Sequence, residues 1–267
     1  VYDKIKTKKR ICIIPNGKLS NLPFQCLGQK TAGGKFKFFI EDHGLFYTND
    51  IGIFAKSRTS VPEKTDMKSF AAFGVLDDKL KHNITEVKEI GRIIGSEKTV
   101  FADARATERQ AKSSLVEKKY LHFATHGVLN YSEDYTLSYL KFLPDQDTSE
   151  GNNGKLTILE IQEMPLKGVN LVTLSACETG VSQQLAQSWN LSPANAFILR
   201  GAQSAVASLW KVDDEATSIL MNEFYANLNK KMDKVDALRL AQVKLSNNPK
   251  YTHPFYWGAF VLYGEWR

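Results

Sequence analysis

Short apolar runs that alternate with helical patterns constrain the fold of this chain more than any other feature. The runs have few polar positions inside them and are bounded by Gly, Pro or Asn, which is typical of strands buried on both faces. They lie at residues 11–14, 38–40, 45–47, 69–75, 120–124, 170–175, 204–209 and 257–264. Such strands predict an α/β fold with a mainly parallel central sheet and helices on both faces.

Segments with apolar residues at helical spacing separate these runs. Helices are expected at residues 85–94, 107–115, 194–200, 214–228 and 236–245. Thr85, Thr107 and Asp214 are expected to cap three of them, because a side-chain oxygen at a helix start can accept a hydrogen bond from a free backbone N–H. Gly201 follows the third helix and suits a C-cap, where the backbone adopts a left-handed conformation.

Two connections between these elements have a distinctive composition. Asp42-His43-Gly44 separates two short apolar runs and predicts a hairpin between them. The stretch from Asp145 to Lys155 is polar and contains glycine, which predicts a long flexible loop. We expect residues 1–267 to form a single domain, in which residues 1–120 build the N-terminal part of the sheet and residues 121–267 carry the reactive groups.

The charge distribution argues against a nucleic-acid or membrane function. The formal net charge is +6, and five basic residues gather near the N-terminus at Lys4, Lys6, Lys8, Lys9 and Arg10. No basic stripe interleaved with aromatic residues follows them, so they predict a solvated lead-in to the first strand. No secretory signal is visible, and no apolar run reaches the ~18 residues that a membrane span needs.

The cysteine content argues against a disulfide framework and a metal site. Cys12, Cys26 and Cys177 are widely and unequally spaced, which is typical of neither arrangement. A reducing, cytoplasmic setting therefore fits best, and neither a metal nor a cofactor is expected. Cys12 lies within an apolar run and Cys26 follows Pro23-Phe24, so both are expected to be packing residues.

Two of the apolar runs end in residues that can carry out chemistry. Residues 120–124 lead into His126-Gly127, and residues 170–175 lead into Cys177-Glu178. Neighbouring parallel strands would bring His126 and Cys177 side by side at their carboxyl ends. An imidazole in that position can accept the thiol proton and later protonate a leaving amine, as nucleophilic catalysis by cysteine requires.

Gly127 and His122 also bear on this chemistry. Because Gly127 has no side chain, its N–H can approach a developing oxyanion and form a two-donor hole with the N–H of Cys177. His122 is the alternative base, but only His126 precedes a glycine, and strand alternation puts His122 on the same face as Ala124. His122 is therefore expected to be packed or hydrogen-bonded near the site, and His253, which precedes a proline, is expected to be structural.

Six blocks of sequence stand in a family-specific order. They are residues 14–24, 106–107, 121–127, 171–180, 201–214 and 253–260. Together they resemble the CHAT domain of the caspase-like (clan CD) peptidases, and the separation of His126 and Cys177, 177 − 126 = 51 residues, is comparable with the separation of about 50 in caspases. Residues 151–154 stand where the family often has Ser-Asp-Gly, and residues 183–191 lack its Gly-rich character, so we expect differences in substrate fit.

The resemblance implies a caspase-like fold and a cysteine endopeptidase that acts through His126 and Cys177. In the wider clan the residue two before the cysteine lines the S1 pocket. Ser175 is small and neutral, which implies a neutral or apolar P1 residue, although Asp213 leaves a basic one open. The resemblance also implies that an extended substrate pairs with an edge strand at residues 208–211. The residues expected to contact substrate are Ser175, Glu178, Ser208, Leu209, Trp210 and Asp213.

The resemblance further implies a protein substrate and a regulatory module as partners. CHAT domains typically follow repeat or sensor modules, such as tetratricopeptide repeats, in longer proteins, and some serve bacterial antiviral defence. A protein substrate and such a module are therefore the expected partners, with residues 145–155 and 183–191 as loops on which regulation acts. Two alternatives stay open: a catalytically silent caspase-like domain that acts by binding, and an acyl or thioester hydrolase that uses the same dyad.

Overall fold

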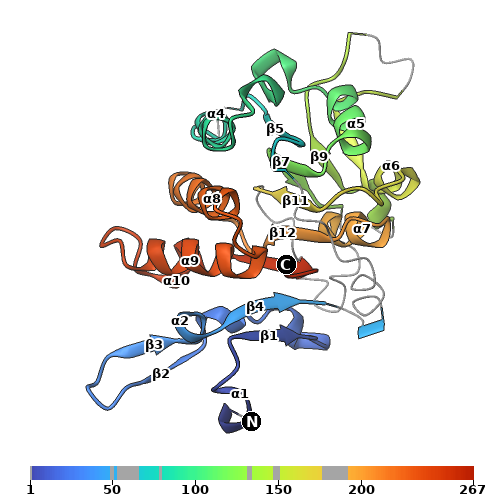
Figure 1. Cartoon of the computed structure of the whole chain (residues 1–267). Coiled ribbons are helices and arrows are strands. Elements are labelled where there is room, and N and C mark those ends of the chain that lie inside the picture. The colour runs from blue at the N-terminus through green and yellow to red at the C-terminus, as the bar shows by residue number, and fades with distance from the viewer. Residues whose placement is uncertain are drawn as a thin grey trace.

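Seven of the eight apolar runs contribute strands to one eight-stranded sheet at the centre of the molecule (Figure 1). The run at residues 38–40 does not join it, and the eighth strand, Val100–Ala102, was not predicted. The computed structural model describes residues 2–48, 51–52, 66–77, 80–130, 134–146, 151–175 and 192–267. In sheet order the strands are β1 (Arg10–Ile13), β4 (Gly44–Tyr47), β13 (Phe260–Gly264), β12 (Ser204–Ser208), β11 (Leu171–Leu174), β7 (Tyr120–Ala124), β5 (Phe70–Gly74) and β6 (Val100–Ala102). Neighbouring strands are parallel except β12 and β13, which confirms the predicted α/β fold with a mainly parallel sheet.

Helices cover both faces of this sheet (Figure 1). One face carries α4 (Asn83–Ile94), α8 (Asp214–Asn229) and α9 (Lys234–Ser246), whose apolar residues join one buried cluster. The other face carries α5 (Glu108–Glu117), α6 (Ile158–Glu163) and α7 (Pro193–Leu199), which join a second cluster. Burial on both faces explains why the central strands are nearly continuous apolar runs in the sequence.

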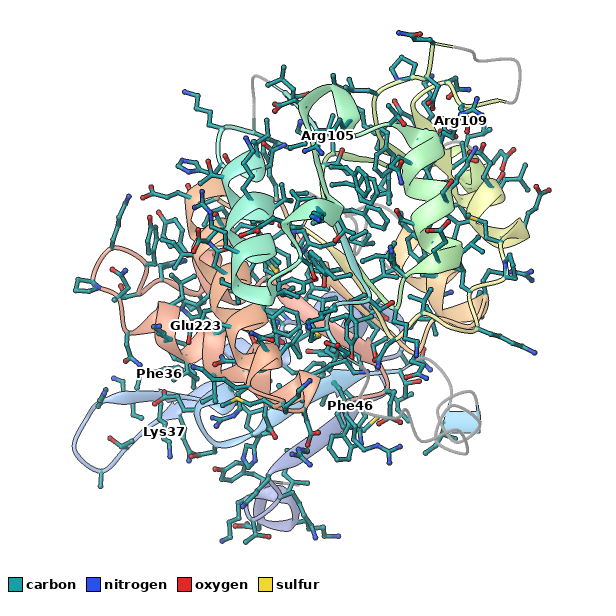
Figure 2. All side chains as sticks on the ribbon, turned by 45° about the horizontal axis from the view of Figure 1, so that its top comes forward. Phe36, Lys37, Phe46, Arg105, Arg109 and Glu223 are labelled. Carbon is teal, nitrogen blue, oxygen red and sulfur yellow. The ribbon has the colours of Figure 1, made fainter. Side chains whose placement is uncertain are left out.

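Smaller elements complete the fold. The short helices are α1 (Tyr2–Ile5), α2 (Phe39–Asp42) and α10 (Pro254–Trp257), and single turns of 3₁₀ helix occur at Gly17–Asn21, Phe24–Cys26, Glu97–Thr99, Asp103–Arg105 and Tyr135–Leu137. β8 (Gly127–Val128), β9 (Tyr139–Lys141) and β10 (Lys155–Thr157) form a three-stranded antiparallel sheet. β2 (Gly28–Lys30) and β3 (Phe36–Phe38) form a two-stranded arm, where Figure 2 shows Phe36 and Lys37 far from Arg105 and Arg109.

The predicted hairpin around His43 is wrong. The last two residues of the first apolar run and the two that follow form α2 (Phe39–Asp42), and the N–H of Phe38 donates to Glu41 Oε1 at 2.7 Å across its first turn. β3 pairs with β2, whereas β4 joins the central sheet between β1 and β13. The two runs therefore belong to different sheets, because a helical turn between them redirects the chain.

The predicted helix caps have mixed outcomes. Thr107 accepts a hydrogen bond from the N–H of Gln110 and caps α5, and Gly201 follows α7 with a φ of 110°, so both predictions are confirmed. Thr85 lies inside α4, which begins at Asn83, so its predicted capping role is wrong.

The cap of α8 is one residue earlier than predicted. Asp213 Oδ1 accepts the N–H of Ala216 at 2.9 Å and caps the helix. Asp214, the predicted cap, is the first helical residue, and its Oδ2 accepts the N–H of His82 at 2.7 Å. The two adjacent acids thus have different roles. Asp213 accepts a free backbone N–H of the first turn of α8, and Asp214 links α8 to the residue before α4.

The stretch predicted as a long flexible loop has ordered ends. Asn152 is buried, and the N–H of Phe142 donates to the carbonyl of Gly154 at 2.7 Å. The fully buried Glu108 accepts the N–H of Gly154 at 2.7 Å and contacts Lys112 Nζ at 2.6 Å. Residues 147–150, in the middle of this stretch, lie outside the described residues.

Lys234 is a buried ammonium group at the start of α9. Its Nζ donates to Asn170 Oδ1 at 2.6 Å, and only 3% of the residue is exposed. Burial lowers the pKa of Lys234 to about 7, and the negative charge of Glu265 offsets part of this effect. A folded pKa below the unfolded value of about 10.4 means that, between these values, the unfolded chain binds more protons.

Stability should therefore rise with pH because of Lys234. We expect the free energy of unfolding of the wild type, relative to Lys234→Met, to increase between pH 7 and pH 9 by up to about 1.4 kcal/mol per pH unit. Denaturant unfolding at a series of pH values measures this difference. Lys230→Met, which removes an exposed lysine of the neighbouring turn, is the control, and the same pH dependence in both variants would contradict the account.

Candidate active site

The site lies where β7 and β11 end side by side. These strands are parallel, and Phe123 of β7 is paired with Leu174 of β11. The N–H of Ser175 still donates to the carbonyl of Phe123 at 3.0 Å, one residue beyond the end of β11. His126 lies two residues after the end of β7. The prediction that the strand before His126 is the parallel neighbour of the strand before Cys177 is confirmed. Cys177 and Glu178 themselves lie outside the described residues.

His126 is held by its backbone and by one edge of its ring. Its carbonyl accepts the N–H of Lys141 at 2.8 Å, and the hydroxyl of the preceding Thr125 donates to the Lys141 carbonyl. Its Nε2 lies 3.2 Å from Asp77 Oδ1, while 22% of the side chain is exposed. Nε2 is buried, and its contact with Asp77 has the distance of an ion pair without the angle of a formed hydrogen bond. The exposed part of the side chain therefore belongs to the rest of the ring.

Asp77 is a site residue that the sequence reasoning missed. It lies three residues beyond the end of β5, the strand that pairs with β7 on the side away from β11. Its Oδ2 accepts a hydrogen bond from Lys141 Nζ at 2.8 Å, and its side chain is 13% exposed. The signal for it in the sequence is an acid just past an apolar run, three residues after Gly74.

Gly127 presents its N–H away from the small sheet. Gly127 is paired with Leu140 of β9. Because the N–H of Lys141 donates to the carbonyl of His126, Gly127 and Leu140 occupy a non-hydrogen-bonded position of the antiparallel ladder. The N–H of Gly127 is thus not consumed by β9, as a donor to an oxyanion would require.

His122 is packed inside the molecule, as predicted. Its Nε2 lies 2.7 Å from Glu86 Oε1, and both side chains are buried. The ring of Tyr225 from α8 lies edge-on to His122 with centroids 5.3 Å apart. His253 is structural as expected, because its Nδ1 accepts the N–H of Phe255 at 3.2 Å at the start of α10. His126 is therefore the partly exposed imidazole at the end of β7.

Five of the six residues expected to contact substrate lie in the described part of the chain, and their surroundings differ, whereas Glu178 lies outside it. Ser175 is 7% exposed, and its hydroxyl has no hydrogen-bond partner among the described residues. Ser208 is paired with Phe260 of β13, and the N–H of Leu209 donates to Ala259 at 2.9 Å. The predicted edge strand is thus wrong, because the C-terminal strand β13 covers that side of β12.

Trp210 follows β12, and its Nε1 donates to the carbonyl of Phe255 at 3.1 Å. Asp213 uses its carboxylate to cap α8. The binding roles of these two residues stay predictions.

The described thiols differ from a reactive cysteine. Burial raises the pKa of Cys12 to about 11 and that of Cys26 to about 12. Both are partly buried and pack against the core cluster beneath α8 and α9, as predicted. Since the thiolate is the nucleophile, both should react slowly near neutral pH.

The described ranges contain neither a cluster of metal ligands nor a helix that could span a membrane. In those residues, no group of three or more His, Cys, Asp or Glu side chains could hold a metal ion. The helices in the same part of the chain are too short or too polar to cross a bilayer.

Known structures share this fold. The yeast (Saccharomyces cerevisiae) separase of a separase–securin complex superposes with a TM-score of 0.61 at 13% identity, over 95% of this chain and 15% of the separase chain. The Arg-specific cysteine proteinase gingipain R superposes with a TM-score of 0.66 at 9% identity, over 99% of this chain and 65% of the proteinase chain. At these identities the likeness establishes the caspase-like fold alone.

Relatives by sequence are long repeat proteins. Human tetratricopeptide repeat protein 28 is 22% identical over 303 aligned residues, which cover 96% of this chain and 12% of the human protein. The mouse protein of the same name is 23% identical over 188 residues, covering 60% of this chain and 8% of that protein. The chain thus spans a small part of the length of the curated relatives it matches. The model of the CHAT domain family matches residues 2–265, and the chain belongs to that family.

Proposed function

We propose that this chain is a cysteine endopeptidase in which Cys177 is the nucleophile and His126 is the base. The observation that carries the proposal is the register of β7 and β11, in which the N–H of Ser175 donates to the carbonyl of Phe123. Ser175 precedes Cys177 by two residues, and Phe123 precedes His126 by three. A partly exposed imidazole at this strand end suits the role of base. Membership of the CHAT family and the caspase-like fold support the same reading.

The reaction proceeds in two steps. The Cys177 thiol gives its proton to Nδ1 of His126, and the thiolate attacks the carbonyl carbon of the scissile peptide bond. The tetrahedral oxyanion accepts hydrogen bonds from the N–H groups of Gly127 and Cys177, and the imidazolium returns the proton to the leaving amine. In the second step His126 takes a proton from water, and the hydroxide attacks the thioester carbonyl carbon. The C–S bond then breaks to release the carboxylic acid product, and the imidazolium returns its proton to the Cys177 thiolate, which regenerates the thiol and the neutral imidazole.

The substrate contacts follow from the same end of the sheet. Ser175 offers a small neutral wall, and its buried hydroxyl has no hydrogen-bond partner within the described part of the chain, which suits a neutral or apolar P1 residue. Ser208, Leu209 and Trp210 lead out of β12 beside this position, since β12 is the other neighbour of β11. With Glu178 and Asp213 they are proposed to line the path of an extended substrate.

Regulation by a repeat module is part of the proposal. The mammalian relatives are named as tetratricopeptide repeat proteins, and this chain corresponds to 12% of the human one. A regulatory module of that kind, in the same protein or in a partner, would therefore control access to the site. A role in bacterial antiviral defence is part of the proposal and is supported by the family resemblance.

Alkylation of the whole protein tests the dyad. We expect iodoacetamide at pH 7 to modify Cys177 first, because an adjacent imidazole raises its thiolate fraction, while the raised pKa values keep Cys12 and Cys26 largely protonated. Intact-protein mass spectrometry should show fast addition of one label. That phase should vanish in Cys177→Ala and slow at least about tenfold in His126→Ala.

His122→Ala is a poor control because His122 is buried against Glu86, so His253→Ala, which alters an exposed imidazole, serves instead. It should leave the fast phase intact. Labelling of Cys177 at the rate of free glutathione would contradict an activated thiolate, and the binding-domain alternative would then be preferred.

The P1 preference tests the role assigned to Ser175. We expect Ser175→Asp to move the preference in a peptide library from neutral or apolar residues toward Arg and Lys, because a carboxylate in the pocket attracts a cation. The ratio of kcat/KM for Arg over Leu at P1 should rise by at least about tenfold. Ser192→Asp, at the start of α7, is the matched control, and an equal change in both variants would exclude Ser175 from the pocket.

A further inference from the structure

A carboxylate is placed against the ring of His126 by elements that the proposed reaction does not use. Asp77 Oδ1 lies 3.2 Å from His126 Nε2, and Asp77 Oδ2 accepts a hydrogen bond from Lys141 Nζ at 2.8 Å. Asp77 follows the end of β5, His126 lies in the turn after β7, and Lys141 is the last residue of β9. The carboxylate thus bridges the imidazole and an ammonium group.

The backbone fixes both partners of the Asp77–His126 contact. The side-chain amide of Asn83, at the start of α4, donates to the carbonyl of Val75 and, at 3.3 Å, to that of Ala124. These carbonyls lie two residues before Asp77 and two residues before His126. The N–H of Val75 also donates to the carbonyl of Ala124 at 3.4 Å. A buried amide therefore holds the ends of β5 and β7 together immediately before the two side chains leave them.

Three other acids that the structure describes near this end of the sheet have different partners. Glu86 contacts His122, Asp213 caps α8, and Asp214 accepts the N–H of His82. Among the described residues, Asp77 is the acid within ion-pair distance of His126. Lys141 supplies the opposite charge on the far oxygen, and this charge-assisted hydrogen bond holds the carboxylate in place.

We propose that Asp77 is the positioning residue of His126, which it holds in the tautomer protonated at Nε2 so that Nδ1 is free to accept a proton. A carboxylate that accepts the N–H of one ring nitrogen fixes both the ring orientation and the tautomer. The present contact has the distance but not the angle of that hydrogen bond, as is common before substrate binds. That Nδ1 accepts the proton of Cys177 rests on the proposed function, whereas the assignment of the Nε2–H tautomer to His126 does not.

Long-range ¹H–¹⁵N NMR of the histidine rings reads the tautomer directly. In the wild type above pH 8, we expect His126 to carry its proton at Nε2. In Asp77→Ala, we expect the two tautomers to mix, while the ring signals of His122, held by Glu86, stay unchanged. The alkylation rate of Cys177 should fall by roughly 10- to 100-fold, because the ring is no longer oriented.

Asp134→Ala is the matched control, since it removes an exposed carboxylate just before the 3₁₀ turn at Tyr135–Leu137 and leaves Asp77 and Lys141 in place. It should retain the Nε2–H tautomer. His126 protonated at Nδ1 in the wild type, an unchanged tautomer in Asp77→Ala, or equal mixing in both variants would overturn the proposal. If Asp77→Ala does not fold, the near-isosteric Asp77→Leu replaces it: mixed tautomers of His126 support the proposal, and an unchanged tautomer overturns it. Should Cys177 prove unreactive in the wild type, the peptidase proposal fails while the tautomer still decides the role of Asp77.

Discussion

The parallel ladder between β7 and β11, flanked by β5, is the constraint on which the rest of this site depends. Because parallel strands point their carboxyl ends in one direction, three chain segments leave the sheet at neighbouring places. One carries Asp77, the next carries His126, and the third leads toward Cys177. The two apolar clusters, one on each face, make this ladder rigid, since Leu171 in one cluster and Phe123 in the other are completely buried.

Contacts beyond the sheet refine what the ladder provides. Asn83 binds carbonyls of both β5 and β7 where they end. Lys141 joins β9 to the same region twice, through its backbone to His126 and through its side chain to Asp77. Polar groups buried at the end of a sheet are costly unless they are paired. Their pairing here therefore determines the placement of the imidazole more tightly than the strand alone could.

The sequence predicted the central strands well because burial on both faces leaves a pattern that is independent of strand order. β7 matches its predicted run residue for residue, and the cap at Thr107 follows from local chemistry. Asp77 could not be found in the same way, because β5 and β7 are neighbours only after β6 is placed outside them. The error at Ser208 has the same origin: β13 pairs with β12 only because the last strand returns antiparallel. Hydrophobic pattern specifies which segments are strands, and long-range pairing specifies which side chains meet.

The central claim is that Cys177 forms a covalent acyl-enzyme with a peptide substrate. Acid quenching of the protein during incubation with a peptide library, followed by mass spectrometry of the fragment that contains Cys177, tests it most directly. The account predicts a thioester adduct on Cys177 that hydroxylamine removes and that His126→Ala no longer forms. Peptide cleavage that persists in Cys177→Ala, or binding of peptides with neither adduct nor cleavage, would contradict it.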